Sequence, residues 1–126
     1  MLTDAPLVAF AATTNLDRAR EFYGDMLGLR LTEQNQFAAV FATPAAMLRV
    51  TLVDKLVPAG YTVLGWEVPD IVAAVHDLAA RGIDFNHYDG FDQDADGIWT
   101  APSGARVAWF PDPDGNTLSL TEFTGA

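Results

Sequence analysis

Apolar positions along the chain form one pattern that occurs twice. The run LVAFAA at residues 7–12 reads as a strand, and it leads into residues 16–27, where apolar side chains recur at helical spacing. A second run, VLGWEV at residues 63–68, leads into residues 71–82 with the same spacing. Each predicted helix has a residue typical of an N-cap and a closing glycine, namely Asn15 with Gly28 and Asp70 with Gly82.

Short β-type runs follow each predicted helix. Turn signals divide them, the clearest being Pro102-Ser103-Gly104 and the stretch from Pro113 to Asn116. The chain is therefore predicted to be a strand, a helix and three or more strands, repeated once. The runs are LRLTEQ (29–34), FAAVFA (37–42) and MLRVTLV (47–53) in the first half, and IDFNHY (83–88), GIWTAP (97–102), ARVAWF (105–110) and TLSLTEF (117–123) in the second.

The two halves are predicted to form a single domain over residues 1–126. Residues 54–60, DKLVPAG, contain Pro and Gly without periodicity and form the natural link. Neither half alone would bury enough surface for comfortable stability, so we expect them to share a core or an interface. The expected bounds are about 5–54 for module one, 54–61 for the linker and 62–124 for module two.

Composition and charge exclude several classes of partner. Half of the 126 residues are apolar, and 17 acidic residues against 7 basic ones give a net charge of −10. This field repels phosphate backbones, so we expect no nucleic-acid partner. The sequence has no cysteine, no basic leader segment and no apolar run of the ~18 residues that span a bilayer. We expect a soluble, cytoplasmic protein with no membrane partner.

Three stretches resemble the vicinal oxygen chelate superfamily, which groups glyoxalases, bleomycin-resistance proteins and extradiol dioxygenases. Asn15-Leu16-Asp17-Arg18-Ala19, with Phe22-Tyr23 and Leu27-Gly28-Leu29, resembles its opening module. Val68-Pro69-Asp70, with Ala73-Ala74-Val75 and Arg81-Gly82-Ile83, resembles its second module. The most specific match is FPDPDGNTLSL at residues 110–120, which resembles its closing hairpin. Most of these residues have structural roles and say nothing about chemistry.

The resemblance implies an α+β fold. Two βαβββ modules related by a pseudo-two-fold axis would curl mixed sheets around a shared cavity, and the protein would be a homodimer. We expect residues 7–53 to superpose on residues 63–122, with Val8 on Val63 and Arg49 on Ser119.

The resemblance also implies where a catalytic metal would lie. Four side chains, each His, Gln or Glu, would come from the first and last strands of the modules, and they align with Val8, Arg49, Val63 and Ser119. Valine has no lone pair, and a guanidinium repels a second cation. The chain is therefore assigned to a branch that lacks the metal ligands, with no metal, no cofactor and no catalytic residue.

Other candidate metal donors are weak. His76 is predicted to be a solvated helix residue, while His87 alternates with Phe85 and could point into the cavity. Residues 92–97, DQDADG, copy the first half of an EF-hand loop, but Ser103 stands where the bidentate glutamate belongs. We interpret this stretch as a solvated acidic loop.

Period-two alternation along the strands predicts which residues line a pocket beside the four aligned positions that lack metal donors. Arg49 and Glu67 could pair with each other, or Arg49 could also point to solvent; alternatively Arg49 clamps a ligand carboxylate or carbonyl, or Glu67 receives a ligand cation. Among the aromatic residues, Trp66, Trp109, Phe41 and Phe110 are expected in the core or at a dimer contact, and Trp99 at the pocket mouth. The predicted lining is Val8, Phe10, Arg49, Thr51, Val63, Glu67, Trp99, Ser119 and Thr121.

These observations favour a metal-free protein that sequesters a small organic molecule, neutral or cationic, as bleomycin-resistance proteins do. One alternative is a lyase or isomerase of the glyoxalase type, which either binds its metal at positions other than the four aligned ones or works without a metal, with Glu67 or His87 as general base. Another is a dimeric interaction module whose cavity is filled by its own side chains. The sequence favours binding over catalysis and does not name the ligand.

Overall fold

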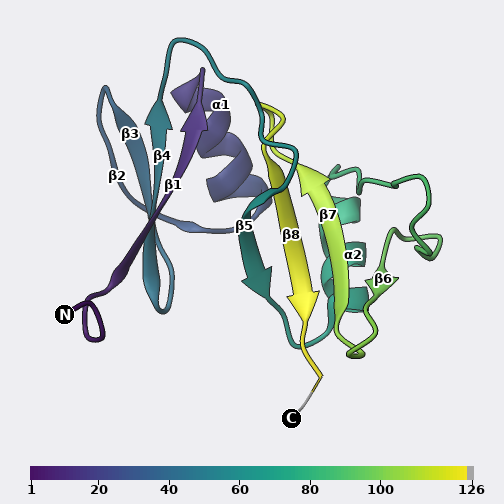
Figure 1. Ribbon diagram of the computed structural model, residues 1–126. Helices are drawn as coiled ribbons and strands as arrows, with labels where there is room; N and C mark the ends of the chain where they lie inside the picture. The colour runs from purple at the N-terminus through teal and green to yellow at the C-terminus, as the bar shows by residue number, and fades with distance from the viewer. Residues whose placement is uncertain (125–126) are drawn as a thin grey trace. The chain divides into compact units, whose positions relative to one another are not determined.

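The computed structural model describes residues 1–124 and divides the chain into two compact units, one over Met1–Pro58 and one from Ala59 onward. Each unit carries one four-stranded sheet and a helical segment (Figure 1). Within residues 1–124, no helix is long and apolar enough to cross a membrane.

The first unit is a mixed sheet with a helix against one face. Its strand order is β1-β4-β3-β2, with β1 parallel to β4 and the other neighbours antiparallel. The elements in chain order are β1 (Leu7–Thr13), α1 (Leu16–Arg20), the π-helical turn η1 (Glu21–Met26), β2 (Arg30–Gln34), β3 (Ala38–Ala42) and β4 (Ala46–Leu52).

The helical segment of the first unit begins and packs as its pattern predicts. The Asn15 side chain accepts a hydrogen bond from the Arg18 N–H at 3.0 Å, which caps the first turn. The segment ends in a π turn, in which the Leu27 N–H donates to the Phe22 carbonyl at 2.9 Å. Tyr23 packs on Phe22 and on Phe41 of β3, with ring centroids 5.1 and 6.0 Å away. Because these rings are buried, they form the centre of the first core.

The second unit repeats the topology of the first. Its strand order is β5-β8-β7-β6, again with the first strand parallel to the last. The expected α+β fold of two βαβββ modules is thereby confirmed. The elements are β5 (Thr62–Glu67), α2 (Ile71–Ala80), β6 (Trp99–Thr100), β7 (Arg106–Pro111) and β8 (Thr117–Glu122).

A tight hairpin joins β7 to β8. Asp112 Oδ1 accepts from the backbone N–H groups of Asp114 and Asn116, both at 2.9 Å, and its Oδ2 accepts from Asn116 Nδ2 at 2.8 Å. Gly115 has φ of +88°, where a side chain would be strained. The Asp-Pro-Asp-Gly-Asn sequence thus fixes the register of both strands, because its own side chains form the hydrogen bonds that hold the turn.

One expected strand does not form. Residues 83–88 were predicted to be β, but the chain from Arg81 to Ile98 is an irregular segment that leads to a two-residue β6. The Gln93 side chain satisfies its backbone: Oε1 accepts from the Tyr88 N–H at 2.7 Å, and Nε2 donates to the carbonyls of Asn86 and Gly97. The Gln93 side chain therefore makes hydrogen bonds to the backbone that a neighbouring strand would otherwise make.

Glu122 ties the start of α2 to the sheet. Its Oε1 accepts from the Ile71 N–H and its Oε2 from Arg106 Nη2, both at 3.0 Å. The Ile71 hydrogen bond, together with the Arg106 guanidinium, lowers the pKa of Glu122 below 4.5.

The lowered pKa of Glu122 predicts a loss of stability in acid. A carboxyl whose pKa is lower in the folded than in the unfolded state stabilises the fold while it is ionised, and this contribution disappears as the pH falls below 4.5 through the folded-state value. We expect the melting temperature to fall more steeply from about pH 5 to pH 3 in the native protein than in Glu122→Gln. Scanning calorimetry across that range measures both slopes, and equal slopes would contradict the assignment.

Candidate functional site

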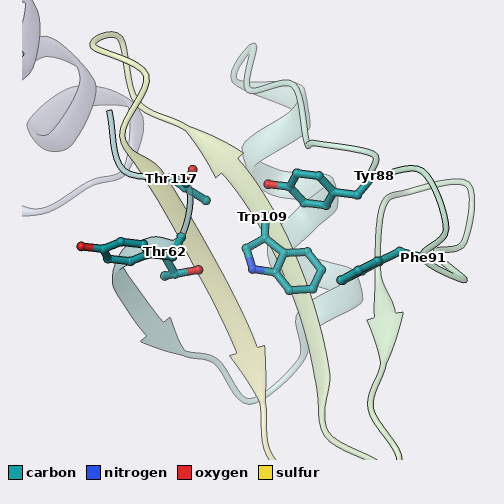
Figure 2. A pocket seen from close by; sticks show the side chains of 7 residues that line it. Thr62, Tyr88, Phe91, Trp109 and Thr117 are labelled. Carbon is teal, nitrogen blue, oxygen red and sulfur yellow. The ribbon is translucent and has the colours of Figure 1, made fainter. Parts of the chain in front are cut away.

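The second unit contains a cavity walled by aromatic rings. Its volume is about 270 Å³, and Tyr88, Phe91 and Trp109 lie along it opposite the hydroxyl-bearing Thr62 and Thr117 (Figure 2). Gly60 and Tyr61 complete the lining. The residues come from β5 and the chain just before it, from β7, from β8 and from the irregular segment that precedes β6.

Strand pairing places four predicted site residues of this unit on the sheet face that carries Trp109, although none of the four is among the residues that line the cavity. Their role in binding stays a prediction. Ser119 pairs with both Gly65 and Trp109, so its side chain shares a face with that ring. Thr121 pairs with Glu67 and with Val107, and Val107 in turn pairs with Trp99. The face therefore presents Glu67, Trp99, Ser119 and Thr121, as alternation predicts, and it also presents Trp109.

A glycine in β5 lets the Ser119 side chain approach the backbone of that strand closely. A Cβ at Gly65 would lie 2.7 Å from Ser119 Oγ, closer than a carbon can approach without something shifting. Ser119 itself is buried. The hydroxyl is therefore packed against the β5 backbone.

Trp109 is the centre of a cluster of four rings. Its ring centroid lies 5.6 Å from Tyr88, 5.7 Å from Phe91 and 6.0 Å from Trp99. Phe91 also contacts Tyr88 at 5.8 Å and Trp99 at 5.6 Å. Tyr88 and Phe91 meet Trp109 edge to face, which is a favoured arrangement of aromatic pairs.

The segment that carries Tyr88 and Phe91 is held in place at several points. Its Asn86 N–H donates to the Trp109 carbonyl at 2.7 Å, and Asn86 Nδ2 donates to the Tyr88 hydroxyl at 3.0 Å. The Tyr88 oxygen accepts that bond, so its own proton is free to be donated to a bound molecule. Hydrogen bonds within the protein therefore hold the wall of the cavity.

Val63 lies in a β-bulge. Thr62 pairs with Thr117 and Leu64 with Leu118, so β5 uses two residues where β8 uses one. The bulge breaks simple alternation, and Thr62 rather than Val63 lines the cavity. The proposed role of Val63 in a pocket stays a prediction.

In the first unit, the predicted site residues share one sheet face. Phe10 pairs with Arg49 and Ala12 with Thr51 between β1 and β4, while Val8 pairs with Met47. Phe10 and Val8 are exposed, whereas Arg49 and Thr51 are half-buried. The opposite face, which includes Val50 and Leu48, packs in the core. Their role in binding also stays a prediction.

Sequence reasoning missed Trp109, Tyr88, Phe91, Tyr61 and Thr62. Trp109 was expected in the core or at a dimer contact, yet it is half-buried and lines the cavity. The register of the hairpin could have indicated its position, because a turn over residues 112–116 places Trp109 opposite Ser119. Tyr88 and Phe91 had no such signal, since their segment was read as a strand and a loop.

The residues at the family's metal positions do not fit a divalent cation. In the first unit Val8 offers no donor and Arg49 is a cation; in the second Val63 offers none and Ser119 only a hydroxyl. Elsewhere, Asp94 Oδ1 accepts from the Asp96 and Ile98 N–H groups, and Asp96 Oδ2 lies 3.0 Å from His76 Nε2. Across residues 1–124, no three His, Cys, Asp or Glu side chains gather where they could hold a metal.

Comparison with known proteins identifies the superfamily of the chain. The family model of the Glyoxalase/Bleomycin resistance protein/Dioxygenase superfamily matches residues 7–120, and the chain belongs to that superfamily. No curated protein sequence matches the chain.

Solved structures with the same fold cover nearly the whole chain. A superfamily member from Sphaerobacter thermophilus DSM 20745 is 26% identical with a TM-score of 0.76, covering 97% of this chain and 99% of its own. A glyoxalase family protein from Enterococcus faecalis is 19% identical, with TM-score 0.72 and coverages of 97% and 100%. A lactoylglutathione lyase from Agrobacterium tumefaciens is 19% identical, with TM-score 0.70 and coverages of 97% and 96%. The last two likenesses bear on the fold alone.

Proposed function

We propose that the protein binds a small organic molecule, neutral or cationic, in the aromatic cavity of its second unit, and does so without a metal. The observation that carries the proposal is the wall of Tyr88, Phe91 and Trp109 facing Thr62 and Thr117. Ligand sites are typically apolar hollows with a few placed polar groups, and this cavity has that character.

The size and chemistry of the cavity favour a ligand of one or two rings. At about 270 Å³ it lies just below the roughly 300–1,000 Å³ of cavities that hold drug-sized molecules. The hydroxyls of Thr62, Thr117 and Tyr88 can exchange hydrogen bonds with a ring nitrogen, carbonyl or amide. An open cavity of this size also favours binding over the alternative of an interaction module filled by its own side chains.

The lining favours binding over catalysis. Among the described residues that line the cavity, the ionisable groups are the phenols of Tyr61 and Tyr88, and the lining has no His, Asp, Glu or Lys side chain, the usual general bases. Together with the donors missing at the metal positions, this supports sequestration of a ligand rather than a glyoxalase-type reaction. We further propose that the protein is a homodimer, as the family resemblance implies, and that it is located in the cytoplasm.

A thermal-shift screen against aromatic antibiotics, cationic glycopeptides and common metabolites tests the proposal. A ligand at 100 times its dissociation constant should add about 2.7 kcal/mol of stability. Turnover of a hemithioacetal, or a screen in which no compound stabilises the protein, would count against it.

Replacing Trp109 with leucine should weaken binding of any compound found in that screen by about tenfold, because the central stacking surface is lost. Trp66→Phe is the matched control, since Trp66 pairs with Leu120 on the opposite face of the sheet. Isothermal titration calorimetry of the native protein and both variants measures the difference. Equal losses in the two variants would mean that the ligand binds elsewhere.

A further inference from the structure

The negative charge of the chain is concentrated in the unit that carries the cavity. From residue 59 onward the sequence holds 11 of the 17 acidic residues and 2 of the 7 basic ones. Both of those basic side chains are engaged by carboxylates: Arg106 by Glu122 at 3.0 Å and Arg81 by Asp77 at 3.5 Å. The field around the cavity is therefore negative, and it attracts cations.

The segment that forms the aromatic wall contributes much of this charge. Asp89 and Asp92 directly follow Tyr88 and Phe91 in the sequence, and both are exposed. Asp94 and Asp96 in the same segment are used in local hydrogen bonds, as described above. The two aspartates beside the rings are thus placed to attract a cation toward the wall without lining the cavity themselves.

Ring faces add a short-range attraction for the same charge. A cation within ~6 Å of a Trp or Tyr ring centroid is attracted by the electrons of the ring face. The cavity lining offers hydroxyls but no carboxylate that could replace the water shell of a compact ammonium ion. The ring faces therefore favour a weakly hydrated cation, because such a cation loses little hydration free energy when it enters the cavity.

We infer that the cavity selects organic cations whose charge is delocalised or alkylated, such as N-alkylpyridinium and quaternary ammonium groups, over neutral and anionic rings of the same size. This inference rests on the proposed function of the cavity and names the class of ligand. It follows from the ring wall, the uncharged lining and the surrounding aspartates taken together.

Three compounds of nearly equal size test the preference: 1-methylnicotinamide, a cation; nicotinamide, which is neutral; and nicotinate, an anion. Titration followed by NMR of the tryptophan indole N–H groups reports on Trp109 and Trp99 at the wall, with Trp66 as internal reference. We expect the cation to bind about tenfold tighter than nicotinamide, to shift the Trp109 signal and to leave the Trp66 signal in place. Nicotinate should bind weakest of the three.

Variants separate the contribution of the ring faces to the cation preference from that of the neighbouring aspartates. Tyr88→Phe keeps a ring face and should keep the preference for the cation, whereas Tyr88→Leu should reduce it. Asp89→Asn combined with Asp92→Asn should weaken cation binding about threefold at low salt and leave nicotinamide unaffected. Asp4→Asn combined with Asp25→Asn, which removes two exposed carboxylates from the first unit, is the control for charge alone.

The outcomes distinguish the inference from the proposed function. If nicotinamide binds as tightly as 1-methylnicotinamide, the inference is wrong and the proposed function stands. If no ring of any charge moves the Trp109 signal, both are wrong. If the cation binds and Tyr88→Leu leaves its preference unchanged, the cation is recognised elsewhere and the inference is again overturned.

Discussion

Replacing Phe110 with alanine is expected to lower the free energy of unfolding of the second unit by about 3–5 kcal/mol. The Phe110 side chain has 0% of its surface exposed and packs against Phe85, with ring centroids 5.3 Å apart. Its removal leaves a cavity between β7 and the segment that follows α2, which the close-packed surroundings can only partly fill.

Urea denaturation measures this loss, and tryptophan fluorescence is a selective reporter because Trp66, Trp99 and Trp109 all lie in the second unit. Phe123→Ala is the matched control: the Phe123 side chain is 61% exposed, so its loss should change stability by at most about 0.5 kcal/mol. Similar midpoints for the two variants would mean that Phe110 is not in the core.

Replacing Asp112 with alanine is expected to cost the same unit about 2–4 kcal/mol. The change removes the acceptor for the Asp114 and Asn116 N–H groups and for Asn116 Nδ2. Asp112 and Asn116 are both buried, so water does not readily replace the lost partner. Chemical denaturation with the same fluorescence reporter gives the value.

A rescue variant tests whether the hydrogen bonds, rather than the bulk of Asp112, are responsible. In Asp112→Asn with Asn116→Asp, the new amide can accept from the two backbone N–H groups and donate to the new carboxylate. We expect this double variant to recover part of the stability that Asp112→Ala loses. No recovery would show that the turn depends on something other than these bonds.

Most of the fold could be predicted because its signals are local. Asn15 and Asp70 were identified as helix caps from their type and position, and each accepts a backbone N–H three residues on. Gly28 and Gly82, the expected closing glycines, have φ of +77° and +98°. Such features depend on a few neighbouring residues, so a single sequence contains them in full.

The aromatic wall could not be predicted because its support is not periodic. Residues 83–88 alternate as a strand would, and nothing in that alternation shows that Gln93 will satisfy the backbone on either side. Because residues 83–88 were predicted to be a strand, Tyr88 and Phe91 were not predicted to line the cavity. By contrast Glu67, Ser119 and Thr121 follow from alternation within regular strands, and their shared face was anticipated.

In the second unit, the residues of the proposed ligand site on the segment 88–92 differ from the residues that stabilise the fold. Tyr88 and Phe91 are exposed, and hydrogen bonds from Asn86 and Gln93 together with ring contacts hold them in place. The core depends on other residues, such as Phe110 and Leu118. Exchanges at positions 88–92 therefore reshape the cavity at little cost to the sheet. A lineage of such proteins could change its ligand by point substitutions in this segment and inherit the rest of the unit unaltered.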